Sequence, residues 1–170
     1  LTKMNSDNHN KSYMVADKLV LSYPIWKGQL KAGTEMSYVR RKAQYQISTI
    51  SLPASQSEVK ERNIAAFAEY AVAIPKAGCF SAGLRYEHVG FDYEDLLHTE
   101  KAISRYDNDL FPSFSWANQW RAVQASLSYS YKTMRPDFQM LDESIFYINS
   151  YSLQQGNPTL KNEKNQQIGL

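Results

Sequence analysis

The sequence lacks several features that would assign a chain of this size to a class directly. Its 170 residues include one cysteine, Cys79, which excludes an internal disulfide and a multi-cysteine metal site. No stretch approaches the roughly 20 apolar residues of a membrane helix. The 19 lysines and arginines and 17 acidic residues leave a net charge of +2 without a basic stripe, so nucleic-acid binding has no electrostatic support.

Motifs for catalysis are missing as well. His9, His88 and His98 have no ligand spacing, and the chain has neither a Gly-rich phosphate loop nor a Ser-centred elbow. The acidic run from Asp92 to Asp95 is expected to be a solvated loop rather than a catalytic pair or a calcium site. The sequence therefore predicts a protein that is not an enzyme and that binds no cofactor or metal.

What the sequence does contain is strict alternation. In "CFSAGLRYEHVGF" (Cys79–Phe91) apolar and polar residues take opposite parities, which predicts a β-strand with one apolar and one polar face. The chain holds six such runs and the start of a seventh: Ser12–Pro24, Gly28–Arg40, Arg62–Ile74, Cys79–Phe91, Leu110–Trp116, Arg121–Tyr131 and Leu160–Leu170. These runs predict an all-β fold.

Short and long connections alternate between these runs. The short ones carry Pro, Gly or Asn, as tight turns require, and the long ones are Arg41 to Lys60, Phe91 to Asp107 and Lys132 to Asn162. This asymmetry is typical of an antiparallel up-and-down meander from a transmembrane barrel, with short periplasmic turns and long outer loops. The alternative is a soluble β-sandwich that binds a ligand or carbohydrate and buries its apolar parity, although a Greek key would mix loop lengths at both ends.

Side chains at three places are candidates for function. On the polar parity, Lys31, Glu35, Glu69, Arg85 and Glu87 are expected to face the lumen, either as an ion-pair network or against a substrate. In the third long connection, Asp137, Phe138, Tyr147 and Tyr151 suit binding of a polar ligand, unless the aromatics only fold the loop back over the barrel mouth. The short turns carry Trp26, Trp116 and Trp120. In a membrane barrel these side chains would form an interfacial aromatic girdle, and in a soluble protein they would fill the bottom of the β-core.

Two long stretches resemble a known family. "AAFAEYAVAIPKAGCFSAGLRYEHVGFDYED" is similar to the middle of the barrel in TonB-dependent outer-membrane receptors, where a strand, a short turn and an "AGLRYE" strand follow in order. The segment from Leu110 to Leu170 resembles the next part of that barrel. There a strand ends in Arg-Pro, matched by Arg135 and Pro136, and a Gly-Asn-Pro-x-Leu segment, Gly156 to Leu160, opens the next strand. The similarity covers most of the chain from about Ser12.

The resemblance implies a barrel of about 22 strands, closed by an N-terminal plug, in the outer membrane of a Gram-negative cell. Such a receptor imports a scarce nutrient, a glycan, peptide or metal chelate, with energy from the inner-membrane TonB complex acting through the plug. Its partners would be outer-membrane lipid, the ligand and that complex, and no nucleic acid. Residues 1–170 are expected to be part of one barrel domain, because they contain no plug and no closing strands.

Overall fold

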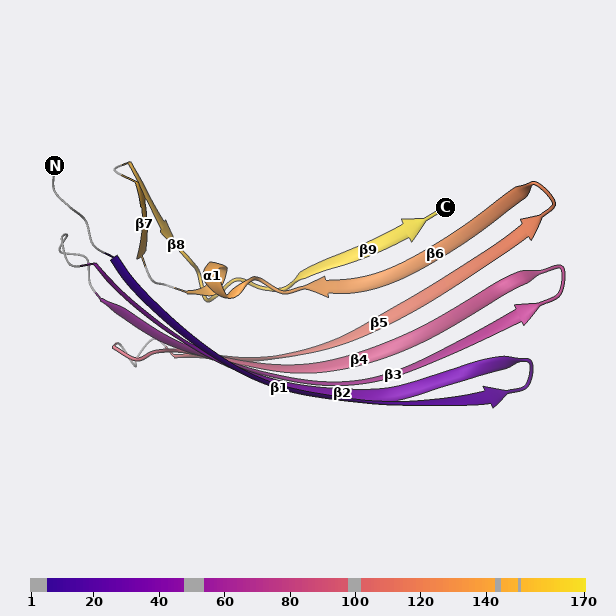
Figure 1. The fold of residues 1–170 in the computed structure, drawn as a ribbon, viewed down its shortest axis with the longest axis horizontal. Coiled ribbons are helices and arrows are strands. Elements are labelled where there is room, and N and C mark those ends of the chain that lie inside the picture. The colour runs from indigo at the N-terminus through magenta and orange to yellow at the C-terminus, as the bar shows by residue number, and fades with distance from the viewer. Residues whose placement is uncertain (1–5, 48–53, 98–101, 143–144, 150) are drawn as a thin grey trace.

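A single curved antiparallel sheet dominates the computed structural model, which describes residues 6–47, 54–97, 102–142, 145–149 and 151–170 (Figure 1). The sheet is built from β1 (Ser6–Ile25), β2 (Gly28–Ile47), β3 (Ser55–Ile74), β4 (Gly78–Asp95), β5 (Ile103–Trp120), β6 (Val123–Met134) and β9 (Glu163–Gly169). Between β6 and β9 the chain forms the short helix α1 (Phe138–Leu141) and a separate hairpin of β7 (Ile145–Asn149) and β8 (Ser152–Gln155).

The strands pair in chain order, and every pair is antiparallel. This confirms the predicted up-and-down meander. The sheet is not closed, because β1 and β9 form its two edges. Figure 1 shows the short turns at one end of the sheet and α1 with the β7–β8 hairpin at the other.

The strands are longer than the alternating runs predicted. β2 continues to Ile47, β3 begins at Ser55, and both contain 20 residues, so much of the expected connection from Arg41 to Lys60 is strand. The connection expected from Phe91 to Asp107 is shortened in the same way by β4 and β5. These extensions are charged, which made them look like solvated loop. Their charges instead pair across the ladder, as Asp92 of β4 does with Arg62 of β3.

The register sorts the side chains onto two faces, because directly opposed residues of a ladder project from the same side. One row crosses the sheet through Leu30, Tyr70, Ala82, Phe114 and Tyr129. The neighbouring row on the other face holds Lys31, Glu69, Gly83, Ser113 and Ser130. We call these the apolar face and the polar face, and their separation confirms the predicted parity.

The apolar face is open in the part of the chain that the structure describes. Leu21, Met36, Leu84 and Leu110 are each more than half exposed, and no second sheet packs over them. A β-sandwich would bury these side chains between two layers about 10 Å apart. The sandwich alternative is therefore wrong.

The apolar face has a limited height. On β3 the apolar positions of this face run from Ile64 to Ile74, about eleven residues, close to the roughly 9–11 residues with which a tilted strand crosses a bilayer core. Beyond Ile64, away from the short turns, the same face carries the charged positions Arg62, Lys60 and Glu58. The face thus changes from apolar to charged along β3, and likewise along β2, where Arg40 and Lys42 follow Met36 and Tyr38.

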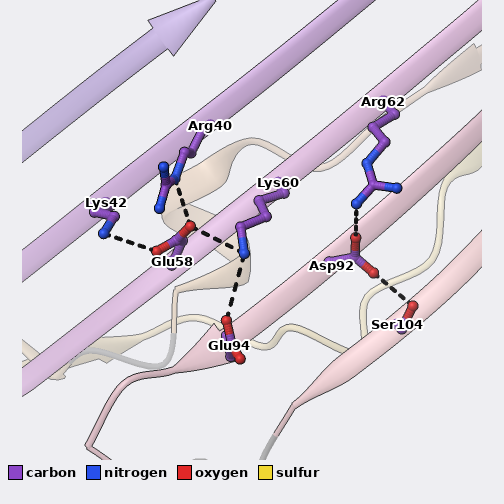
Figure 2. Close-up of polar contacts among 8 residues, drawn as sticks. All are labelled: Arg40, Lys42, Glu58, Lys60, Arg62, Asp92, Glu94 and Ser104. Atoms are coloured by element: carbon purple, nitrogen blue, oxygen red, sulfur yellow. Dashed lines mark hydrogen bonds and ion pairs between the residues drawn. The ribbon is translucent and has the colours of Figure 1, made fainter.

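Glu58 is the centre of this charged region (Figure 2). Its carboxylate accepts a 2.7 Å hydrogen bond from Arg40 Nε and lies 3.1 Å from Lys42 Nζ and 3.3 Å from Lys60 Nζ. The hydrogen bond from Arg40 contributes most to lowering the pKa of Glu58 from 4.5 to about 2, against the opposing effect of burial. Since the folded state lowers this pKa, Glu58 stabilises the fold above pH 4.5, and that contribution is lost as the pH falls toward 2.

We therefore expect Glu58→Gln to lower the free energy of unfolding at pH 7 by on the order of 2–3 kcal/mol. Urea titration of the full-length protein in detergent micelles at several pH values measures this difference, which should shrink as the pH falls below 4.5. Glu94→Gln is the control: Glu94 has a 45% exposed side chain and one 3.8 Å ion pair, worth about 1 kcal/mol or less. Equal effects of the two substitutions at pH 7 would contradict the assignment.

Candidate functional site

The polar face carries a chain of ion pairs across four strands. Glu35 on β2 accepts from Lys18 on β1 and lies 2.6 Å from Nη2 of Arg85 on β4. Arg85 Nε also donates a 2.7 Å hydrogen bond to Glu87 on the same strand. Three of the five predicted polar-face residues, Glu35, Arg85 and Glu87, thus belong to one network.

Arg135, just after β6, extends this network. Its Nη2 donates to Glu87, 48 residues earlier in the chain, and its Nη1 lies 3.7 Å from Glu61 on β3. Arg135 was noted in the sequence only for its Arg-Pro motif, and nothing local indicates its distant partners. With it the network has three cations (Lys18, Arg85, Arg135) and three carboxylates (Glu35, Glu61, Glu87), so its charges balance.

Phe67 is an apolar residue on this polar face. Its ring lies over Gly33, where an added Cβ would come within 2.8 Å of Phe67 Cζ and 2.3 Å of the Leu19 carbonyl oxygen. Lys18 Nζ and Arg85 Cζ lie 5.5 Å and 5.9 Å from the ring centroid. The ring thus covers the glycine backbone and contacts the two cations through its π-face.

Lys31 and Glu69, the other two predicted residues, make no ion pair with the network among the described residues, although Glu69 lines a cavity of about 250 Å³ together with Lys18, Glu35 and Arg85. Lys31 and Glu69 are directly opposed on β2 and β3, nearer the short turns. Glu69 Oε1 accepts a 2.9 Å hydrogen bond from Ser81 Oγ on β4. They share the polar face with the network, and a direct role in binding a substrate stays a prediction.

The long connection after β6 folds onto the polar face. Leu141 of α1, only 5% exposed, packs in a cluster with Val59, Phe91 and Tyr93, and Phe138 packs against that cluster. Figure 1 shows α1 on the concave side of the bent sheet. The fully buried Ser57 donates a 3.1 Å hydrogen bond to the buried Asp142, 85 residues later. These contacts attach the connection to the sheet.

Of the four residues predicted for ligand binding in this connection, Asp137 and Phe138 line the same cavity, whereas Tyr151 does not. Phe138 packs on the sheet with its ring 5.9 Å from the Arg41 guanidinium, whereas Asp137 is exposed and accepts the backbone N–H of Met140 through its own carbonyl. Tyr151 is 99% exposed. The backbone of Tyr147 pairs with β8, and its side chain lies outside the described residues. The expected alternative, aromatics that fold the loop back, agrees with the position of Phe138.

The cavity lined by Asp137 and Phe138 has a volume of about 330 Å³ and lies between this connection and the sheet. Its lining combines apolar groups, Val39 and Phe138, with the polar side chains Glu61, Asn63 and Arg135. The cavity can hold a small polar group or a segment of polypeptide.

The three tryptophans all lie near the short turns. Trp26 is the first residue of the β1–β2 turn, with φ 54°, and its side chain is exposed. Trp116 on β5 donates from Nε1 to the Ala77 carbonyl at 2.9 Å, and its ring centroid is 5.9 Å from that of Trp120. All three tryptophans therefore lie at the same end of the sheet. Their role at a membrane interface stays a prediction.

The histidines and the acidic run form no metal site in the described part of the chain. His88 Nδ1 lies 2.8 Å from Asn108 Oδ1 and its ring stacks on Tyr106, while His98 lies outside the described residues. Asp92 is strand rather than loop, and it accepts hydrogen bonds from Arg62 and Ser104. Among the described residues, no helix is long and apolar enough to cross a membrane.

An antiparallel sheet with a lipid-compatible outer face and a charged, loop-covered inner face defines a wall of a transmembrane β-barrel. The sequence model of the outer membrane protein beta-barrel family matches residues 2–170. The chain therefore belongs to this family, and the protein is located in the outer membrane of a Gram-negative cell. A search of curated proteins gave no match.

The attachment of the connection depends on Leu141, which gives a direct test. Leu141→Ala removes a buried side chain from the cluster and should weaken the attachment by about 2–5 kcal/mol. Hydrogen exchange of the full-length protein in detergent should then become faster in residues 135–160 and stay unchanged near the short turns. Met140→Ala, at a neighbouring position that is 52% exposed, should leave exchange as it is. Unchanged exchange in the Leu141 variant would contradict the packing described above.

Proposed function

We propose that this barrel wall belongs to a TonB-dependent receptor that imports a scarce nutrient, a glycan, peptide or metal chelate. In this proposal the protein is a transporter and not an enzyme. A plug contributed by the rest of the protein occupies the lumen and couples import to the inner-membrane TonB complex.

The proposal rests on the contacts that residues of the two family-like motifs make. Arg135 of the Arg-Pro element pairs with carboxylates of the wall. Gly156 of the Gly-Asn-Pro element donates its backbone N–H to the Asp142 carbonyl at 2.9 Å, and an added Cβ would lie 2.4 Å from that oxygen. The next residue, Asn157, donates its N–H to the Met140 carbonyl. Arg135 thus attaches the start of the connection to the polar face, and Gly156 and Asn157 bind the end of the connection to the segment around α1.

The chemistry of the polar face also favours a protein-filled lumen. A balanced set of cations and carboxylates leaves no strong net field of one sign, in contrast to the charged rings with which open pores select ions. Alternating charges of this kind suit polar contacts with a folded plug. The inward connection supports the same interpretation, because it narrows the lumen from the outer side.

Two measurements that need no knowledge of the ligand test the proposal on the full-length protein. In planar bilayers a plugged receptor should show little steady conductance, and the purified periplasmic domain of TonB should bind the detergent-solubilised protein. A large steady conductance together with no binding of that domain would identify a passive pore and overturn the proposal.

A further inference from the structure

A charged patch extends over the outward face of the sheet beyond the apolar face. We call it the outer belt and define it by the residues that project there from β1 to β4: Lys11, Arg40, Lys42, Glu58, Lys60, Arg62, Asp92 and Glu94. These residues share a face with Leu84 and Ile64, so they project away from the lumen. The belt lies at the end of the sheet that carries the long connections, which is the outer side in a barrel of this type.

The position of the outer belt along the strands places it at the level of the lipid headgroups. The apolar positions end at Ile64, and the next row outward contains Tyr38, Arg62 and Tyr106. Tyrosine favours the membrane–water interface. The belt begins in this row and continues outward, so its side chains lie at the level of the polar headgroups of the outer leaflet.

Cations exceed carboxylates on the β1–β3 side of the belt. Arg40, Lys42 and Lys60 all approach the carboxylate of Glu58, which is only 4% exposed. Lys60 also lies 3.8 Å from Glu94, so two carboxylates face three cations (Figure 2). The cationic side chains around Glu58 remain about one-third to one-half exposed. On its β1–β3 side the belt therefore presents a net cationic surface, with the carboxylate of Glu58 beneath it, while Asp92 and Glu94 lie on its β4 side.

The register also places side chains of like charge directly opposite each other. Lys11 on β1 is directly opposite Lys42 on β2, and Arg40 is directly opposite Lys60 on β3. Directly opposed like charges destabilise a sheet unless a counter-charge lies between them. Glu58 supplies that charge for the second pair. In the first pair Glu58 lies 3.1 Å from Lys42 Nζ, whereas the exposed Lys11 has no ion pair within the described residues, and an external anion can supply its counter-charge.

We propose that the outer belt is a binding site for the phosphorylated glycolipid of the outer leaflet, whose phosphates lie between the cationic side chains of β1, β2 and β3. Phosphate oxygens accept charge-assisted hydrogen bonds from lysine and arginine. The adjoining apolar face packs against the acyl chains of the same lipid. A belt neutralised only by its own carboxylates is the competing explanation, and a protein partner is another.

The test measures binding of the bisphosphorylated lipid anchor of lipopolysaccharide to the full-length protein in detergent. Lys42→Gln/Lys60→Gln should weaken this binding by roughly 30-fold, since each lysine at an anionic membrane surface strengthens binding about fivefold. The matched control, Lys27→Gln/Lys76→Gln, removes the same charge from two short turns at the opposite end and should leave binding unchanged. Lys11→Gln, at an exposed edge-strand position, should weaken binding severalfold and serves if the double variant does not fold.

The same assay with the enzymatically dephosphorylated lipid and with phosphatidylglycerol distinguishes the source of recognition. The proposal requires weaker binding of both, and weaker binding of the phosphorylated lipid at high salt. Equal binding by wild type, double variant and Lys11→Gln would overturn it in favour of a self-neutralised belt. Equal binding of the dephosphorylated lipid would show that the acyl chains alone are recognised and would overturn it as well.

Discussion

The cross-strand register is the constraint from which the other features follow. Each residue of an antiparallel ladder shares its face with the residues opposite it, so a whole row across the sheet meets one medium. The row through Leu30, Tyr70 and Ala82 lies on one face and the neighbouring row through Lys31, Glu69 and Gly83 on the other. In a barrel wall we expect the first row to contact lipid and the second to face the lumen. A slip of one residue between two strands would exchange these media for every side chain of the slipped strand. Backbone groups that lipid cannot hydrogen-bond are satisfied by the same ladder.

The inner surface depends on this register in a second way. Arg85 and Glu35 meet because their rows are adjacent on the polar face, and Arg135 reaches Glu87 because β6 ends beside the same wall. The connection after β6 then needs few additional contacts, chiefly Leu141 in its cluster and Asp142 with Ser57. A rigid wall that holds an irregular connection through a few buried contacts is how barrels position functional loops.

Alternation was sufficient to predict the strands near the short turns, their order and the face of each side chain. It underestimated strand length because Glu58, Lys60 and Asp92 look like loop residues until their partners on neighbouring strands are known. Charge balance across strands has no local signal. From the sequence, Phe138 could either pack on the sheet or bind a ligand, and only its tertiary contact with the sheet decides between the two. Tyr151 is a tyrosine like the candidate Tyr147, but it is exposed because it lies in the turn between β7 and β8, away from the large sheet.

The central claim is that one parity of these strands contacts lipid and the other contacts water. Leu127 and Ser128 are neighbours on β6 that project from opposite faces, opposite Trp116 and Ser115 of β5. Nitroxide labels at Leu127→Cys and Ser128→Cys, in a Cys79→Ser background of the full-length protein in bilayers, report accessibility to oxygen and to an aqueous nickel chelate. The label at position 127 should be relaxed more by oxygen and the label at position 128 more by the chelate. The reverse order, or equal accessibility at both positions, would contradict the assignment of the two faces.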